Sequence, residues 1–293
     1  LVETGEAVGP FLVMGQSGTG KKRLLRQLVL MSNRSFNFIK VEGKATSQRY
    51  EGSAWNDLRQ ALEKLGDEMG ISLLEEEDDL ISVWNQLQSL SKEKPLLILL
   101  ENAQWIDAVS LEKVKQLEER RSQEKWQLIF TAEEPLPASF VNFLGSLKVE
   151  KRLSQLELTN FDPSESRALL KGELGAIEPA VMEQMVEWSE GSPFFLSSYI
   201  EEWKENENLE PLPDIIQAYL SQELGDMSSE EEALLHYLSC FHKPISLSIL
   251  AELTATELPV LIELVEPLSE RAIVSIVEEG EDLLVQFCKQ LVA

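Results

Sequence analysis

The chain has 293 residues, of which 51 are Asp or Glu and 26 are Lys or Arg, so its formal net charge is −25. This length is typical of about two domains, and a hydrophobic content of 43% indicates a folded protein with a solvated acidic surface. The charge argues against binding to nucleic acid or to anionic membranes, because both would repel it. The charge is unevenly distributed: residues 1–60 hold nine basic and five acidic side chains, a net +4 that leaves −29 for the remainder.

Cysteine and histidine are too sparse to predict a zinc site or a disulfide framework. Cys240 and Cys288 lie far apart and the chain has two His, so we expect reduced thiols and a cytoplasmic location. The sequence has no run of 18 apolar residues, which predicts no membrane span. Because the sequence begins at Leu1 without Met, we expect it to be a segment of a longer protein.

Strand and helix patterns alternate over the first 160 residues. Residues 95–100 are apolar throughout, which is typical of a strand covered on both faces of a parallel sheet. The predicted strands are 10–14, 36–41, 95–100 and 126–131, and the predicted helices are 21–31, 54–69, 78–91 and 110–121. This alternation predicts an α/β domain, a three-layer fold with a parallel sheet, over residues 1–160.

The pattern after residue 160 is mainly helical. Helices are predicted at 163–171, 179–189, 194–206, 214–224, 229–241, 246–252 and 256–269, followed by a β-hairpin at 271–277 and 282–287. We therefore expect an α-helical lid over residues 161–210. Three helices and a hairpin predict a winged-helix domain over residues 211–293, with truncation at its C-terminus left open.

A glycine-rich segment follows the first predicted strand and precedes the first predicted helix. It reads Gly15-Gln16-Ser17-Gly18-Thr19-Gly20-Lys21-Lys22 and fits the phosphate-loop pattern G-x-x-x-x-G-K-[ST] except at its last position. In such a loop, backbone N–H groups surround phosphate oxygens, the lysine reaches the β and γ oxygens, and the helix N-terminus favours negative charge. Lys22 stands where a hydroxyl would bind Mg²⁺, and an ammonium group cannot bind a cation.

Polar residues follow the buried apolar run at 95–100. Glu101 lies where phosphate-loop NTPases hold Mg²⁺ through water, and the next residue often polarises the attacking water. Asn102 cannot act as a base. A buried strand must also emerge into polar residues for purely structural reasons, so this position alone does not decide the function.

The sequence around this strand resembles the Walker B region of STAND-type ATPases. The matching residues are Gln104, Trp105, Asp107, Ser110 and Leu111, with Glu101 and Asn102 in place of two acids. Further similarities are a strand ending Thr131-Ala132-Glu133, a lid motif Gly191-Ser192-Pro193-Phe194-Phe195-Leu196, and Phe287-Cys288-Lys289-Gln290-Leu291-Val292 near the C-terminus. Together these matches cover essentially the whole chain.

The resemblance implies a nucleotide-binding module that closes over ATP or ADP to switch a larger signalling protein. It implies that residues 15–22 hold phosphates, that Glu101 faces Mg²⁺ through water, and that Pro193 approaches the nucleotide. Arg23 is a further candidate phosphate contact, although a solvated helix residue is the simpler interpretation. The implied partners are other domains or proteins of that assembly, with no nucleic acid and no membrane bound through this segment.

Three departures from the family pattern concern hydrolysis. Lys22 replaces a metal ligand, Asn102 replaces a water-polarising acid, and Glu133 replaces a sensor arginine. We expect hydrolysis to be slow or absent, and we predict that Lys22 pairs with Glu133 inside the pocket. Three hypotheses stay open: a nucleotide switch, an active Mg²⁺-dependent ATPase that uses Glu101, and a pure protein-interaction platform that binds no nucleotide.

Overall fold

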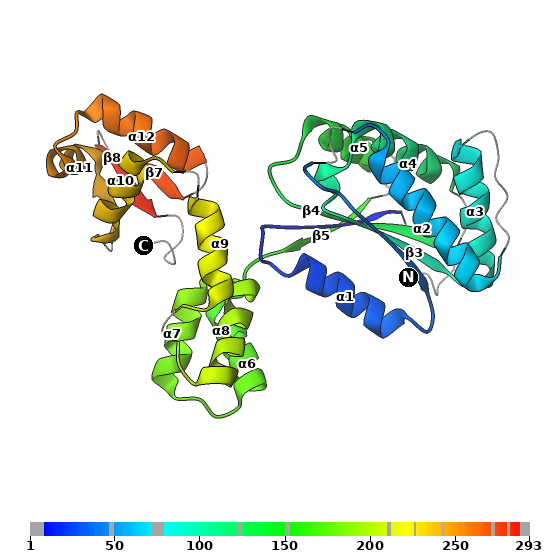
Figure 1. Ribbon diagram of the computed structural model, residues 1–293, viewed down its shortest axis with the longest axis horizontal. Coiled ribbons are helices and arrows are strands. Elements are labelled where there is room, and N and C mark those ends of the chain that lie inside the picture. The colour runs from blue at the N-terminus through cyan, green and yellow to red at the C-terminus, as the bar shows by residue number, and fades with distance from the viewer. Residues whose placement is uncertain are drawn as a thin grey trace. The chain divides into compact units, whose positions relative to one another are not determined.

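The computed structural model divides the chain into two compact units, Leu1–Thr159 and Asn160–Ala293 (Figure 1). The described residues are 9–46, 50–71, 79–121, 125–149, 153–209, 212–225, 227–241, 243–270, 273–279 and 282–287. Most of the predicted C-terminal motif, residues 288–292, lies outside these ranges, as do Cys288 and His242.

The first unit is built on a five-stranded sheet in which all strands are parallel. The order is β2-β3-β4-β1-β5, so β1 lies between β4 and β5. The strands are β1 Phe11–Gly15, β2 Asn37–Glu42, β3 Leu96–Glu101, β4 Trp126–Ala132 and β5 Ser154–Leu158. Every residue of β3 and β4 is buried, as the continuous apolar patterns predict.

Helices cover both faces of this sheet (Figure 1). Alternate strand residues point to opposite faces, so Leu97 and Leu99 pack toward α1, whereas Ile98 and Leu100 pack into the larger core on the other face. That larger core also holds buried side chains of four further helices. The helices of this unit are α1 Lys21–Ser32, α2 Ser53–Met69, α3 Asp79–Glu93, α4 Ala108–Arg120 and α5 Ala138–Val149, with a short 3₁₀ turn at Ala103–Trp105.

The predicted α/β domain with a parallel sheet is confirmed. Each strand predicted between residues 10 and 131 is present with its ends moved by one residue or less, and the four predicted helices are present with ends shifted by up to two. Helix α5 and strand β5 were not among the predicted elements, although they complete the layer and the sheet edge beside β1.

The second unit contains two separate hydrophobic cores. One is built from α6 to α9 and includes Leu170, Met185, Leu196, Tyr199 and Ile216. The other is built from α10 to α12 and a three-stranded antiparallel sheet of order β6-β8-β7. The helices are α6 Pro163–Leu174, α7 Pro179–Ser189, α8 Pro193–Asn206, α9 Asp214–Leu224, α10 Ser229–Ser239, α11 Leu247–Thr254 and α12 Leu258–Glu270; the strands are β6 Ile245–Ser246, β7 Val274–Glu279 and β8 Asp282–Phe287.

A close backbone approach fixes the turn between α7 and α8. Gly191 has a φ of 72°, and its carbonyl accepts a hydrogen bond of 2.8 Å from the backbone N–H of Phe161. A Cβ at Gly191 would overlap the carbonyl oxygen of Phe161, so this position requires glycine.

No helix in the described ranges is long and apolar enough to cross a membrane.

Candidate functional site

The glycine-rich loop joins the carboxyl end of β1 to the first turn of α1. Gly18 and Gly20 have φ values of 81° and 93°, which only glycine adopts readily. Gly20 precedes the helix without a side-chain cap, and the first turn of α1 contains no acidic residue. A Cβ at Gly20 would meet no atom within 4 Å, so space is open beside the helix N-terminus. This arrangement suits an anion, because the first N–H groups of a helix and its dipole favour negative charge.

Lys21, the first residue of α1, turns back toward its own loop. Its Nζ donates hydrogen bonds to the carbonyl oxygens of Gly15 (2.7 Å) and Gln16 (2.8 Å) and to Oε2 of Glu133 (3.1 Å). The residue is only 7% exposed. Thr19 supports the same loop, because its hydroxyl donates to the carbonyl oxygen of Gln16 at 2.8 Å. Three acceptors use all three donors of the ammonium group.

The prediction that Lys22 pairs with Glu133 is wrong, because each of the two residues has a different partner. Nζ of Lys22 lies 2.6 Å from Oε1 of Glu42, at the end of β2, while Glu133 binds Lys21. Successive residues of a helix point about 100° apart, so two adjacent lysines reach different strands. The hydrogen bond between Lys22 and Glu42 lowers the pKa of the carboxyl and raises the pKa of the ammonium group, against the opposing effect of burial.

Glu101 ends β3 as a buried carboxylate, 4% exposed. Its Oε2 lies 2.9 Å from Nζ of Lys40, but accepts no hydrogen bond of good geometry from the described residues. Asn102 follows in a left-handed conformation; its backbone N–H donates to the hydroxyl of Thr131 and its side-chain amide donates to Glu42. Glu101 thus lies at the carboxyl end of a buried strand, and its water-mediated contact with Mg²⁺ stays a prediction; the described residues contain no cluster of three His, Cys, Asp or Glu that could hold a metal.

These side chains gather at the carboxyl ends of four neighbouring strands. Glu42 and Glu101 are paired in register on β2 and β3, and Ala132, just before Glu133, is paired with Met14, just before the loop. Glu42, Glu101 and Glu133 all raise the pKa of Lys22, because their negative charges lie near this end of α1. In parallel α/β sheets, ligands bind outside the carboxyl ends of the strands. Glu42 and Lys40 were not predicted to belong to the site, because their only signal in the sequence was a position at the end of a predicted strand.

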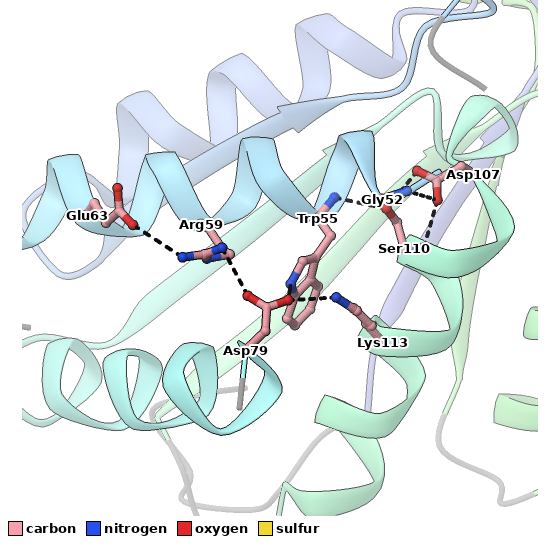
Figure 2. Close-up of polar contacts among 8 residues, drawn as sticks. All are labelled: Gly52, Trp55, Arg59, Glu63, Asp79, Asp107, Ser110 and Lys113. Carbon is pink, nitrogen blue, oxygen red and sulfur yellow. Dashed lines mark hydrogen bonds and ion pairs between the residues drawn. The ribbon is translucent and has the colours of Figure 1, made fainter. Parts of the chain in front are cut away.

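The motif residues Asp107 and Ser110 have a different role from the loop (Figure 2). Asp107 caps α4 by accepting a hydrogen bond from the backbone N–H of Ser110 at 2.9 Å, and it also accepts one from the backbone N–H of Gly52 at 2.8 Å. Ser110 in turn accepts a hydrogen bond from the backbone N–H of Trp55 at 2.9 Å. Asp107 and Ser110 therefore join the N-terminal ends of α2 and α4.

A second polar cluster lies beside this joint (Figure 2). Oδ2 of Asp79 accepts hydrogen bonds from the indole of Trp55 at 2.5 Å and from Lys113 at 2.6 Å, and Oδ1 pairs with Arg59 at 3.1 Å. Burial raises the pKa of Asp79, but the hydrogen bonds from Lys113 and Trp55 outweigh it and leave the pKa lowered. The Asp107–Ser110 cluster connects α2 to α4, and the Asp79 cluster connects α2, α3 and α4, so both act on the packing of these helices.

The predicted lid motif lies entirely in the second unit. Pro193 is buried at the first position of α8, where the missing N–H of proline costs no helical hydrogen bond. Arg23 lies in the first turn of α1 beside Lys21 and Lys22. The approach of Pro193 and Arg23 to a nucleotide stays a prediction.

Residues 6–138 match the AAA domain family. The match begins before β1, covers the loop, Glu101, Asn102 and Glu133, and ends at the start of α5. With the parallel five-stranded sheet, it establishes an α/β P-loop NTPase fold for this part of the chain. No curated protein has a sequence similar enough to count as a relative.

Solved structures of similar fold include the Aeropyrum pernix ORC2 protein in its ADPNP–ADP complexes. It is 16% identical over 98% of this chain and 85% of that one, with a TM-score of 0.57. The Aeropyrum pernix ORC1 protein in complex with DNA is 14% identical over 98% and 85%, with a TM-score of 0.49. The Thermotoga maritima RuvB Holliday junction branch migration motor is 15% identical over 97% and 87%, with a TM-score of 0.44. At these identities, the similarity to ORC2 supports the AAA fold and nothing more specific.

Proposed function

We propose that this protein is a STAND-like regulatory module that binds ATP or ADP as a conformational switch, with slow or absent hydrolysis. The observation that carries the proposal is the loop itself: positive-φ glycines, an uncapped helix N-terminus and the buried Lys21 form a site suited to phosphate at the carboxyl end of β1. The AAA domain match over the same residues supports it.

The loop and α1 would hold the phosphates. Backbone N–H groups of residues 15–22 and the first turn of α1 would donate to phosphate oxygens, and Lys21 would turn from the carbonyls of Gly15 and Gln16 to the phosphates. Bound Mg²⁺ would neutralise phosphate charge, and Glu101 would hold a water molecule of its coordination shell. Glu101 would have to leave Lys40 to do so.

The groups that hydrolysis needs are replaced at three positions of this site. Lys22 offers no oxygen to a metal, the amide of Asn102 donates to Glu42 and cannot take a proton from water, and Glu133 presents negative charge. Losing one positioned catalytic group commonly lowers the rate by about 10²–10⁴-fold. A protein that binds nucleotide without rapid hydrolysis would exert its effect through the conformation that it has while nucleotide is bound.

The second unit would supply the parts that respond to the nucleotide. We propose a helical lid over residues 161–210 and a winged helix over 211–293. Helices α10 to α12 followed by the antiparallel sheet β6-β8-β7 support the latter. The net charge of −25 argues against a role for this winged helix in binding DNA. Other domains or proteins of a signalling assembly are the partners that we propose.

A second candidate is a protein-interaction platform that binds no nucleotide. The ion pair between Lys21 and Glu133 favours it, because the lysine that would hold phosphate already has three acceptors. An active ATPase that uses Glu101 is the third candidate, supported only by the position of that carboxylate.

Titration calorimetry with ADP and ATP, each with and without Mg²⁺, separates these candidates. The switch predicts saturable binding that Lys21→Ala abolishes and that Lys64→Ala leaves unchanged, because Lys64 is an exposed lysine on α2. Under the switch hypothesis, the rate at which the original chain releases phosphate from ATP is expected to equal the rate measured for the Lys21→Ala variant. Absence of heat and of any thermal shift would leave the interaction platform, and release above the Lys21→Ala level would establish the ATPase.

A further inference from the structure

Glu133 is the carboxylate that occupies Lys21. It follows β4, the strand next to β1, so the fold itself places it against the loop. Its Oε2 lies 3.1 Å from Nζ of Lys21, and the other two bonds of that ammonium go to the carbonyls of Gly15 and Gln16. A phosphate that contacts Lys21 must therefore displace one of these three acceptors or share the ammonium group with them, and Glu133 is the acceptor that carries a negative charge.

Three lysines at this end of the sheet are each paired with a carboxylate. Three pairs join Lys21 to Glu133, Lys22 to Glu42, and Lys40 to Glu101. The charges of these six groups sum to zero. Together they therefore provide no net electrostatic attraction for a negatively charged ligand. The pairs differ in position: Lys21 is buried in the loop, whereas more than half of the Lys22 and Lys40 side chains is exposed.

We propose that Glu133 sets the nucleotide preference of this site and makes it select nucleoside diphosphates over triphosphates. This inference rests on the proposed nucleotide binding. Lysines of such loops reach the β and γ phosphates, so a γ-phosphoryl group brings its charge to the place that Glu133 faces. A displaced Glu133 stays at the end of β4, beside that charge, and like charges in a partly buried site repel strongly. A nucleoside diphosphate has no γ-phosphoryl group, so this repulsion does not act on it.

The experiment compares the dissociation constants for ADP and ATP in the chain and in Glu133→Gln. The substitution keeps the shape of the side chain and removes its charge. We expect the original chain to bind ADP at least about tenfold more tightly than ATP in EDTA, which corresponds to 1.4 kcal/mol. Glu133→Gln should reduce that ratio by about tenfold, mainly through tighter ATP binding. Mg²⁺ should narrow the ratio in the original chain, because it neutralises phosphate charge.

Glu134→Gln is the matched control. Glu134 is the adjacent, exposed carboxylate, and its substitution should leave the ratio unchanged. GDP and GTP are measured in the same way, because the expected repulsion acts on the phosphates and not on the base. Glu133→Ala is the second variant, to be used where Glu133→Gln does not show the original thermal unfolding transition.

The outcomes separate this inference from the function on which it rests. Equal affinities for ADP and ATP in the original chain, or a ratio that Glu133→Gln leaves unaltered, overturn the selection of diphosphate while nucleotide binding stands. Absence of binding of any of the four nucleotides to both the original chain and Glu133→Gln overturns the nucleotide switch, and the selectivity falls with it.

Discussion

The hydroxyl of Ser110 donates a 2.7 Å hydrogen bond to Oδ2 of Asp107, and the two side chains together hold the N-terminal ends of two helices. Asp107 accepts from Gly52 and Ser110, and Ser110 accepts from Trp55, so backbone donors at the start of α2 and of α4 share one buried pair. Residues that resemble part of an ATPase motif thereby act here on the packing of α2 against α4.

Asp107→Ala should lower the free energy of unfolding by about 2–4 kcal/mol. It removes the cap of α4 and leaves the partly buried N–H of Gly52 without its acceptor, two effects of about 1–2 kcal/mol each. Urea unfolding measures the change. Asp57→Asn, at an exposed position of α2, is the control and should stay within about 0.5 kcal/mol of the original chain. An equally small effect of Asp107→Ala would contradict the structural role.

The contribution of Asp107 to stability should disappear in acid. Burial raises the pKa of Asp107, but hydrogen bonds from Ser110, Gly52 and Ala54 outweigh it, so the pKa lies below its ordinary value of 3.8. A carboxyl group with a lowered pKa stabilises the fold fully above its unfolded pKa and loses this effect as the pH falls through its folded pKa. The difference in unfolding free energy between the original chain and Asp107→Asn should be constant at pH 5–7 and shrink below about pH 4. A difference that stays constant to pH 3 would contradict the lowered pKa.

Most of the first unit could be predicted because its strands and helices differ in period. The apolar run at 95–100 is typical of a buried strand and the spacing of Trp55, Leu58 and Leu62 is typical of a helix, and the structure agrees. Strand β5 was not predicted, because it is a short edge strand with only two apolar residues and its three central residues are exposed. Helix α5 was predictable: its buried Phe140, Phe143, Leu144 and Leu147 have helical spacing.

The ion pairs of the site could not be read from the sequence. The alternation of strands and helices predicts parallel strands but not which strands are neighbours, and Lys21 reaches Glu133 only because β1 lies beside β4. Similarly, Lys40 meets Glu101 because β2 pairs with β3 in a register that places Glu42 opposite Glu101. The glycines and the lysine of the loop are a local pattern and were identified without this information.

Gly191→Ala should destabilise the second unit by about 2–4 kcal/mol. The alanine would have to adopt a left-handed backbone conformation, which costs about 1–2 kcal/mol. Its Cβ would also overlap the carbonyl oxygen of Phe161. Gly172→Ala is the matched control, since Gly172 lies within α6 with open space around it and the change should stabilise by about 0.5–1 kcal/mol. Thermal unfolding of both variants measures this, and a similar gain in stability from both would contradict the close approach at Gly191.

Lys22→Thr should make nucleotide binding more dependent on Mg²⁺ without restoring hydrolysis. The hydroxyl would stand at the position where the P-loop pattern places a metal ligand, whereas Asn102 and Glu133 would still lack the groups that catalysis needs. The lost pair with Glu42 is largely exposed, so the stability should change by less than about 1 kcal/mol. We expect the ratio of ATP affinities with and without Mg²⁺ to rise about tenfold, which is 1.4 kcal/mol. Lys22→Ala removes the same ammonium group without adding an oxygen, so equal Mg²⁺ dependence in the two variants would show that residue 22 does not reach the metal.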